Sequence, residues 1–110
     1  MADRRKEQIA YNEAAFRKLN ESLESNVHRG RPEEDFAGFV CECGDGDCDA
    51  IVQLDLATYE RIREDPMLFF AVSGHEAQDA EDVVDDHGHY VVVRKHDDVS
   101  EIVEATDPRS

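Results

Sequence analysis

Three cysteines, Cys41, Cys43 and Cys48, lie within one short stretch of the chain. In an extended segment, residues i and i+2 project to the same side, so the first two sulfurs aim at one point. The Gly-Asp-Gly-Asp sequence between Cys43 and Cys48 is typical of a turn, which would bring the third sulfur back to that point. Thiolates are soft ligands that suit zinc, so this spacing predicts one Zn²⁺ site that adds to the stability of the fold.

A closed structural zinc site needs a fourth ligand, and the sequence leaves several candidates open. His75 is the first choice, because it follows an apolar strand at a Gly-containing turn, from which its side chain can be aimed back across a sheet. His87 is the second. The fourth ligand could also be His28, His89, Asp45, Asp47 or Asp49, or a bound water, which would make the site catalytic.

The same cysteines allow three other interpretations. They can fill an apolar core, or Cys43 and Cys48 can form a disulfide or a redox pair. Iron–sulfur ligation is a weaker interpretation, because it usually requires four cysteines. A metal site is favoured over these because three thiols lie so close together in the sequence.

Charge limits the class of partner. Asp and Glu number 27 against 12 Lys and Arg, which gives a net charge of −15. Such a chain repels phosphate backbones and anionic lipid surfaces, so we expect neither a nucleic-acid nor a membrane partner. No apolar stretch approaches the roughly 20 residues of a membrane span, and the first residues lack the apolar core of a signal peptide. We expect a cytoplasmic protein, where reducing conditions keep thiols free.

Apolar periodicity predicts an α+β fold. An amphipathic helix is expected from Arg4 to Ser25, with Ile9, Phe16, Leu19 and Leu23 facing a partner surface, either the sheet of this domain or another subunit. A small sheet of about four strands and two short helices should follow. The expected strands are Phe36 to Cys43, Ala50 to Leu54, Met67 to Val72 and Tyr90 to Arg94, and the expected helices are Asp55 to Glu64 and Glu76 to Asp86, the latter burying Ala80, Val83 and Val84 and ending at Gly88.

These elements divide the chain into four parts. Residues 1–28 form the N-terminal amphipathic helix and residues 29–35 a linker. Residues 36–96 form the zinc-stapled α+β core, in which the metal ties the first hairpin to the turn at Gly74. Residues 97–110 are an acidic tail, in which Val99, Ile102 and Val103 give a weak helical pattern.

Part of this pattern resembles a known family. The residues that carry the resemblance are Phe39-Val40-Cys41-Glu42-Cys43, Cys48, Leu54-Asp55-Leu56-Ala57-Thr58-Tyr59-Glu60, Arg63, Pro66, Phe69 or Phe70, Gly74-His75-Glu76, Val83-Val84, His87 and Tyr90-Val91-Val92-Val93, together with Asn12-Glu13-Ala14, Phe16-Arg17 and Asn20-Glu21. This pattern, between Asn12 and Lys95, is similar to that of short uncharacterised actinobacterial proteins. The resemblance implies no known activity. It implies that His75 and His87 belong to the same pattern as the cysteines, which favours His75 as the fourth ligand.

The leading functional hypothesis is a zinc-binding cytoplasmic module for protein interaction or regulation, with a structural Cys3His site. It would bind a protein partner or a second copy through its N-terminal helix or its acidic faces. The first alternative is a metal-dependent hydrolytic enzyme with an open zinc position and Glu76 or Glu42 as general base. Two more hypotheses are a thiol redox sensor and an acidic mimic of nucleic acid.

Overall fold

The protein is described by a computed structural model covering residues 4–25, 36–77 and 79–109, so the predicted linker and His28 lie outside the described residues. The elements are α1 (Arg4–Ser25), β1 (Phe36–Val40), β2 (Ile51–Asp55), α2 (Leu56–Arg63), β3 (Leu68–Val72), β4 (Glu81–Asp86), β5 (Tyr90–Lys95), a 3-10 turn η1 (Asp97–Val99) and α3 (Ser100–Ala105). The α+β prediction is confirmed.

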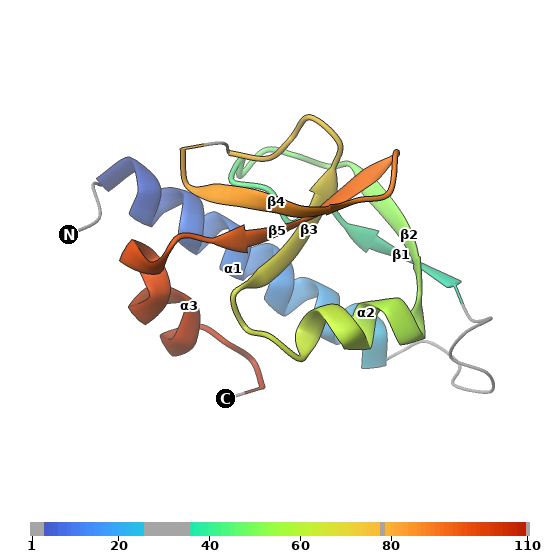
Figure 1. The fold of residues 1–110 in the computed structure, drawn as a ribbon. Helices are drawn as coiled ribbons and strands as arrows, with labels where there is room; N and C mark the ends of the chain where they lie inside the picture. The colour runs from blue at the N-terminus through green and yellow to red at the C-terminus, as the bar shows by residue number, and fades with distance from the viewer. Residues whose placement is uncertain (1–3, 26–35, 78, 110) are drawn as a thin grey trace.

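The strands form two small antiparallel sheets. β1 pairs with β2, placing Val40 opposite Ile51, and the second sheet has the order β3-β5-β4. The chain just beyond β1 joins the two sheets, because the Glu42 N–H donates to the Phe70 carbonyl at 2.9 Å. In Figure 1, α1 runs past these sheets with α3 beside it, so residues from both ends of the chain lie close together.

β3 and β5 are buried on both faces, which explains their continuous apolar runs. On one face, Phe70 and Val92 pack in a cluster with residues of β1, β2 and α2. On the other, Phe69 and Val93 pack with Ala10 of α1 and with Val99 and Val103 of the C-terminal segment. The C-terminal segment is therefore helical and covers part of the core.

The helix predicted from Glu76 to Asp86 is wrong. Residues Glu81–Asp86 instead form β4, which pairs with β5 through a bulge between Val83 and Asp85. Val83 and Val84 are exposed, although Ala80 is buried as expected. Gly88 has a φ of +88° in the turn between these strands and does not cap a helix. The open edge of β5 decides this conformation, because β-branched residues suit a strand when a partner strand is available. This adds a fifth strand to the four that were predicted.

The buried face of α1 also differs from the prediction. Leu19 is 46% exposed, and Phe16 and Leu23 are only half-buried. The buried residues are Ile9, Ala10, Glu13, Ala14, Arg17, Asn20 and Glu24. α1 therefore docks on its own domain, and it does so with a largely polar face.

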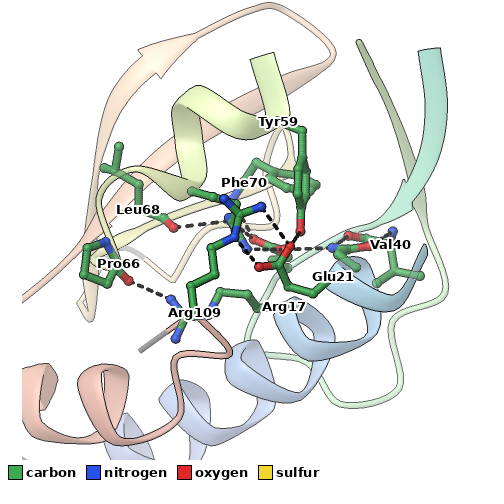
Figure 2. A network of polar contacts seen from close by, with 11 residues as sticks. Arg17, Glu21, Val40, Tyr59, Pro66, Leu68, Phe70 and Arg109 are labelled. Atoms are coloured by element: carbon green, nitrogen blue, oxygen red, sulfur yellow. Dashed lines mark hydrogen bonds and ion pairs between the residues drawn. The ribbon is translucent and has the colours of Figure 1, made fainter. Parts of the chain in front are cut away.

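Specific polar contacts hold this face. The guanidinium of Arg17 donates to the carbonyl oxygens of Pro66 at 2.7 Å and Val103 at 3.0 Å, and it lies 4.6 Å from the centroid of the Phe69 ring. Figure 2 shows Arg17 pointing toward Pro66 and Glu21 lying between Tyr59 and Arg109. The Tyr59 hydroxyl donates to Glu21 at 2.9 Å, and Arg109 forms an ion pair with the same carboxylate.

Candidate metal centre

The three cysteines and His75 converge. Cys41 and Cys43 are each 1% exposed, Cys48 is half-buried, and His75 is exposed. One potential ligand atom from each residue lies within 4.8 Å of all the others. Within the part of the chain that the structure describes, this is the single group of Cys, His, Asp and Glu side chains with such a geometry.

The distances to His75 fit tetrahedral coordination. Nδ1 of His75 lies 3.7 Å from the sulfur of Cys41 and 3.6 Å from that of Cys48. Zinc bonds of about 2.3 Å to sulfur and 2.0–2.1 Å to nitrogen, at a tetrahedral angle, separate the two ligand atoms by about 3.6 Å. The four residues can therefore hold one metal ion. The His75 nitrogen and the sulfurs of Cys41 and Cys48 would have to move little to bind it.

The cysteine-bearing segment leaves the sheet earlier than predicted. β1 ends at Val40, and Cys41 to Cys43 follow it outside any assigned strand. The Cys41 N–H donates to the Ala50 carbonyl at 2.9 Å, whereas the next N–H, that of Glu42, donates to the Phe70 carbonyl of β3. The sulfurs of Cys41 and Cys43 still belong to one converging group, as the alternation predicts.

A tight turn positions His75 behind β3. Gly74 has a φ of +93°, a conformation that favours glycine. The His75 N–H closes this turn on the Val72 carbonyl at 2.9 Å, and a carboxylate oxygen of Glu76 accepts from the Gly74 N–H at 2.8 Å. The turn thus directs the imidazole back to the cysteines, as its position in the sequence predicts.

Burial controls the electrostatics of the site. It raises the pKa of the Cys41 and Cys43 thiols, and the neighbouring cysteines raise that of Cys41 further. A backbone N–H of Val72 partly offsets this, since it donates to the Cys41 sulfur at 3.2 Å and stabilises a thiolate. A bound divalent cation would supply the missing positive charge and displace the thiol protons.

The remaining candidate ligands lie outside this group. The imidazole of His87 pairs with the Asp85 carboxylate at 2.8 Å and stacks on Tyr90 with ring centroids 4.6 Å apart. Neither His89 nor any of the three candidate aspartates, Asp45, Asp47 and Asp49, is part of the converging set of described residues. Among the residues that the structure describes, only His75 completes the set with the three cysteines.

Sequence reasoning missed the group that supports the site from behind. Glu42, between the two buried cysteines, is 0% exposed and accepts two hydrogen bonds from Arg63, at 2.7 and 3.0 Å. The Asn20 amide also donates to Glu42 at 2.8 Å. This arrangement excludes Glu42 as a base facing the metal, because its carboxylate is held by Arg63. The only sequence signal was alternation, which turns Glu42 away from the cysteines.

Comparison with known proteins gives no assignment. No family model, no curated protein and no solved structure matches this chain. The resemblance to short actinobacterial proteins therefore stays an expectation. Among the described residues, no helix is both long enough and apolar enough to cross a membrane.

Proposed function

We propose that the protein is a small interaction or regulatory module whose fold is held by one zinc ion bound to Cys41, Cys43, Cys48 and His75. The observation that carries this proposal is the convergence of three sulfurs and one imidazole within 4.8 Å. Three thiolates and a histidine form a closed tetrahedral set, which is typical of structural zinc and leaves no position for a reacting water. Soft sulfur ligands favour zinc over magnesium or calcium.

Metal analysis tests this proposal directly. We expect protein purified without chelator to contain one zinc per chain and to have no thiol that reacts with a chromogenic disulfide until the metal is removed. Cobalt substitution should give the strong visible absorption of tetrahedral cobalt–thiolate. Three freely titrating thiols in a protein that takes up no added zinc would contradict the proposal and favour core-filling cysteines.

A matched pair of histidine variants tests the fourth ligand. Loss of a residue that merely supports a ligand already costs about 10–100-fold in metal affinity. We therefore expect His75→Ala to lower zinc affinity at least about tenfold in chelator competition, while His87→Ala leaves it unchanged. Equal affinities for the two variants would remove His75 from the site.

The acidic edge strand β4 is our candidate for the interaction surface. β4 is an outer strand of its sheet, and it exposes Val83 (44%) and Val84 (54%) beside the carboxylates of Asp82, Asp85 and Asp86. Exposed apolar side chains surrounded by negative charge suit a partner that is basic and partly apolar. We propose a basic protein segment as this partner.

Paired capture experiments test this surface. We expect the wild-type protein to retain a basic partner from the native cell that salt releases, and the Val83→Ser/Val84→Ser variant to lose it. Both forms should keep the same zinc content. A partner that the variant retains equally well would place the interaction elsewhere.

A further inference from the structure

The segment from Val40 to Gly44 contacts two different parts of the molecule on alternate residues. Cys41 and Cys43 face the other ligands of the proposed zinc site. Val40, Glu42 and Gly44 instead contact α1. This short segment therefore lies between the proposed metal site and the N-terminal helix.

Two asparagines of α1 make these contacts. The Asn20 side chain both accepts from the Val40 N–H at 2.8 Å and donates to the Val40 carbonyl at 2.9 Å, and it also donates to Glu42. Two turns earlier, Asn12 donates to the Gly44 carbonyl at 2.8 Å. The helix thus contacts every second residue of the segment.

Gly44 lies flush against the helix. A Cβ added at this position would lie 2.6 Å from Ile9 Cγ2, which is closer than real Cβ contacts. A Cβ at Gly46, by contrast, would make an ordinary contact of 3.7 Å with Asn12. Because no space remains at Gly44, a shift of this loop toward α1 would push against Ile9.

Few other bonds fix this loop. For residues 44–49, the structure describes one backbone–backbone hydrogen bond, from the Cys48 N–H to the Asp45 carbonyl at 3.1 Å. This bond lies within the loop itself. Cys48 and His75 lie near the buried Cys41 and Cys43, with one ligand atom of each of the four residues within 4.8 Å of the others. A metal ion would replace those contacts with four coordinate bonds and so fix the position of the loop.

The inward face of α1 makes its docking sensitive to such a shift. Of its buried residues, Glu13, Arg17 and Asn20 are polar or charged and at most 1% exposed. Apolar contacts tolerate small displacements, but buried polar groups lose stability steeply when their partners move. Docking of α1 therefore depends on the exact positions of its partners.

We propose that metal occupancy controls the docking of α1: zinc binding fixes the Val40–Gly44 segment in the form that Asn12 and Asn20 recognise, and loss of the metal releases the helix. This inference rests on the zinc site proposed above. Because binding linkage is reciprocal, the factor by which zinc strengthens the docking of α1 is also the factor by which docked α1 strengthens zinc binding. A released α1 would uncover its polar inward face and the surface that it covers.

Hydrogen exchange of the full chain tests this inference. It is measured with zinc and after chelation, at a temperature below the unfolding midpoint of the metal-free protein. On metal removal we expect the amide protection of residues 4–25 to fall at least about tenfold, within the usual range of coupling between sites. After chelation, β3 and β5 should remain better protected than α1, because their amides exchange only when the whole domain unfolds. Zinc binding with unchanged protection of α1 would overturn the inference and leave the zinc site standing. Equal protection of α1, β3 and β5 after chelation would also overturn it, because the helix would then open only when the whole domain unfolds.

The reciprocal experiment uses variants of α1 that touch no ligand atom. We expect Asn20→Ala to lower zinc affinity about tenfold in chelator competition. The matched control, Lys18→Ala, changes an exposed residue of the same helix and should leave the affinity unchanged. Unchanged affinity in both folded variants would overturn the coupling. A wild-type protein that binds no zinc would instead reject the proposed site itself.

Discussion

Replacing Cys43 by serine is expected to lower the thermal midpoint by at least about 15 °C in the presence of zinc. Loss of a structural metal is one of the few single changes that cost more than about 4 kcal/mol, and each kcal/mol shifts the midpoint of a domain of this size by about 4 °C. Cys43 is 1% exposed within the ligand group, so no solvent-facing residue can take its place. Thermal unfolding followed by circular dichroism measures the shift.

The decisive quantity is the difference in thermal midpoint that zinc causes in each protein. A buried serine has a cost of its own, so the midpoint of each protein is measured with zinc and with chelator. We expect a large difference for the wild type and almost none for Cys43→Ser. Gly46→Ala, a change in the same loop that makes only an ordinary contact, should keep the wild-type difference. If Cys43→Ser still responds to zinc like the wild type, Cys43 is not a ligand.

The candidate site was predictable because its chemistry is local. Cys41 and Cys43 needed only the alternation of an extended chain, and Cys48 needed only a short turn. His75 depended on a Gly-containing turn after a buried strand, and a positive φ at Gly74 confirms that turn. None of these steps required knowledge of the global topology.

The errors arose where distant partners decide the structure. Residues 81–86 read as part of a helix, but they become a strand because the edge of β5 is available to them. The inward face of α1 could not be predicted for the same reason. Polar stripes normally face water, and Glu13, Arg17 and Asn20 are buried only because Lys95, the Pro66 carbonyl and Glu42 lie opposite.

The buried triad of Glu13, Lys95 and Glu81 gives the second large prediction. The Lys95 ammonium lies 2.7 Å from a Glu13 oxygen and 3.1 Å from a Glu81 oxygen, and all three side chains are 0% exposed. This lysine joins α1 to β4 and β5. Lys95→Met is expected to lower the free energy of unfolding by about 3–5 kcal/mol, because it leaves two buried carboxyl groups without a cation. Urea titration measures the loss.

The pH dependence separates this cause from simple loss of packing. Burial and the neighbouring Glu81 raise the pKa of Glu13 well above its ordinary value, and Lys95 lowers it in part. Removing Lys95 raises that pKa further. Above about pH 4.3 the unfolded chain has released the Glu13 proton while the folded chain retains it, so stability falls as pH rises through this window, at up to about 1.4 kcal/mol per pH unit. The decline should continue to higher pH in Lys95→Met than in the wild type.

Glu13→Gln is the matched control for this behaviour. The amide keeps the shape of a protonated carboxyl and leaves the Lys95–Glu81 pair in place, so we expect a loss of less than about 1 kcal/mol at neutral pH and a flatter pH profile. Combined with Lys95→Met, it should remove most of the extra pH dependence of that variant. Parallel pH profiles for the wild type and Lys95→Met would show that Lys95 acts by packing alone. A decline that continues to higher pH and that Glu13→Gln corrects would establish that one buried proton and one ammonium hold α1 against the sheet.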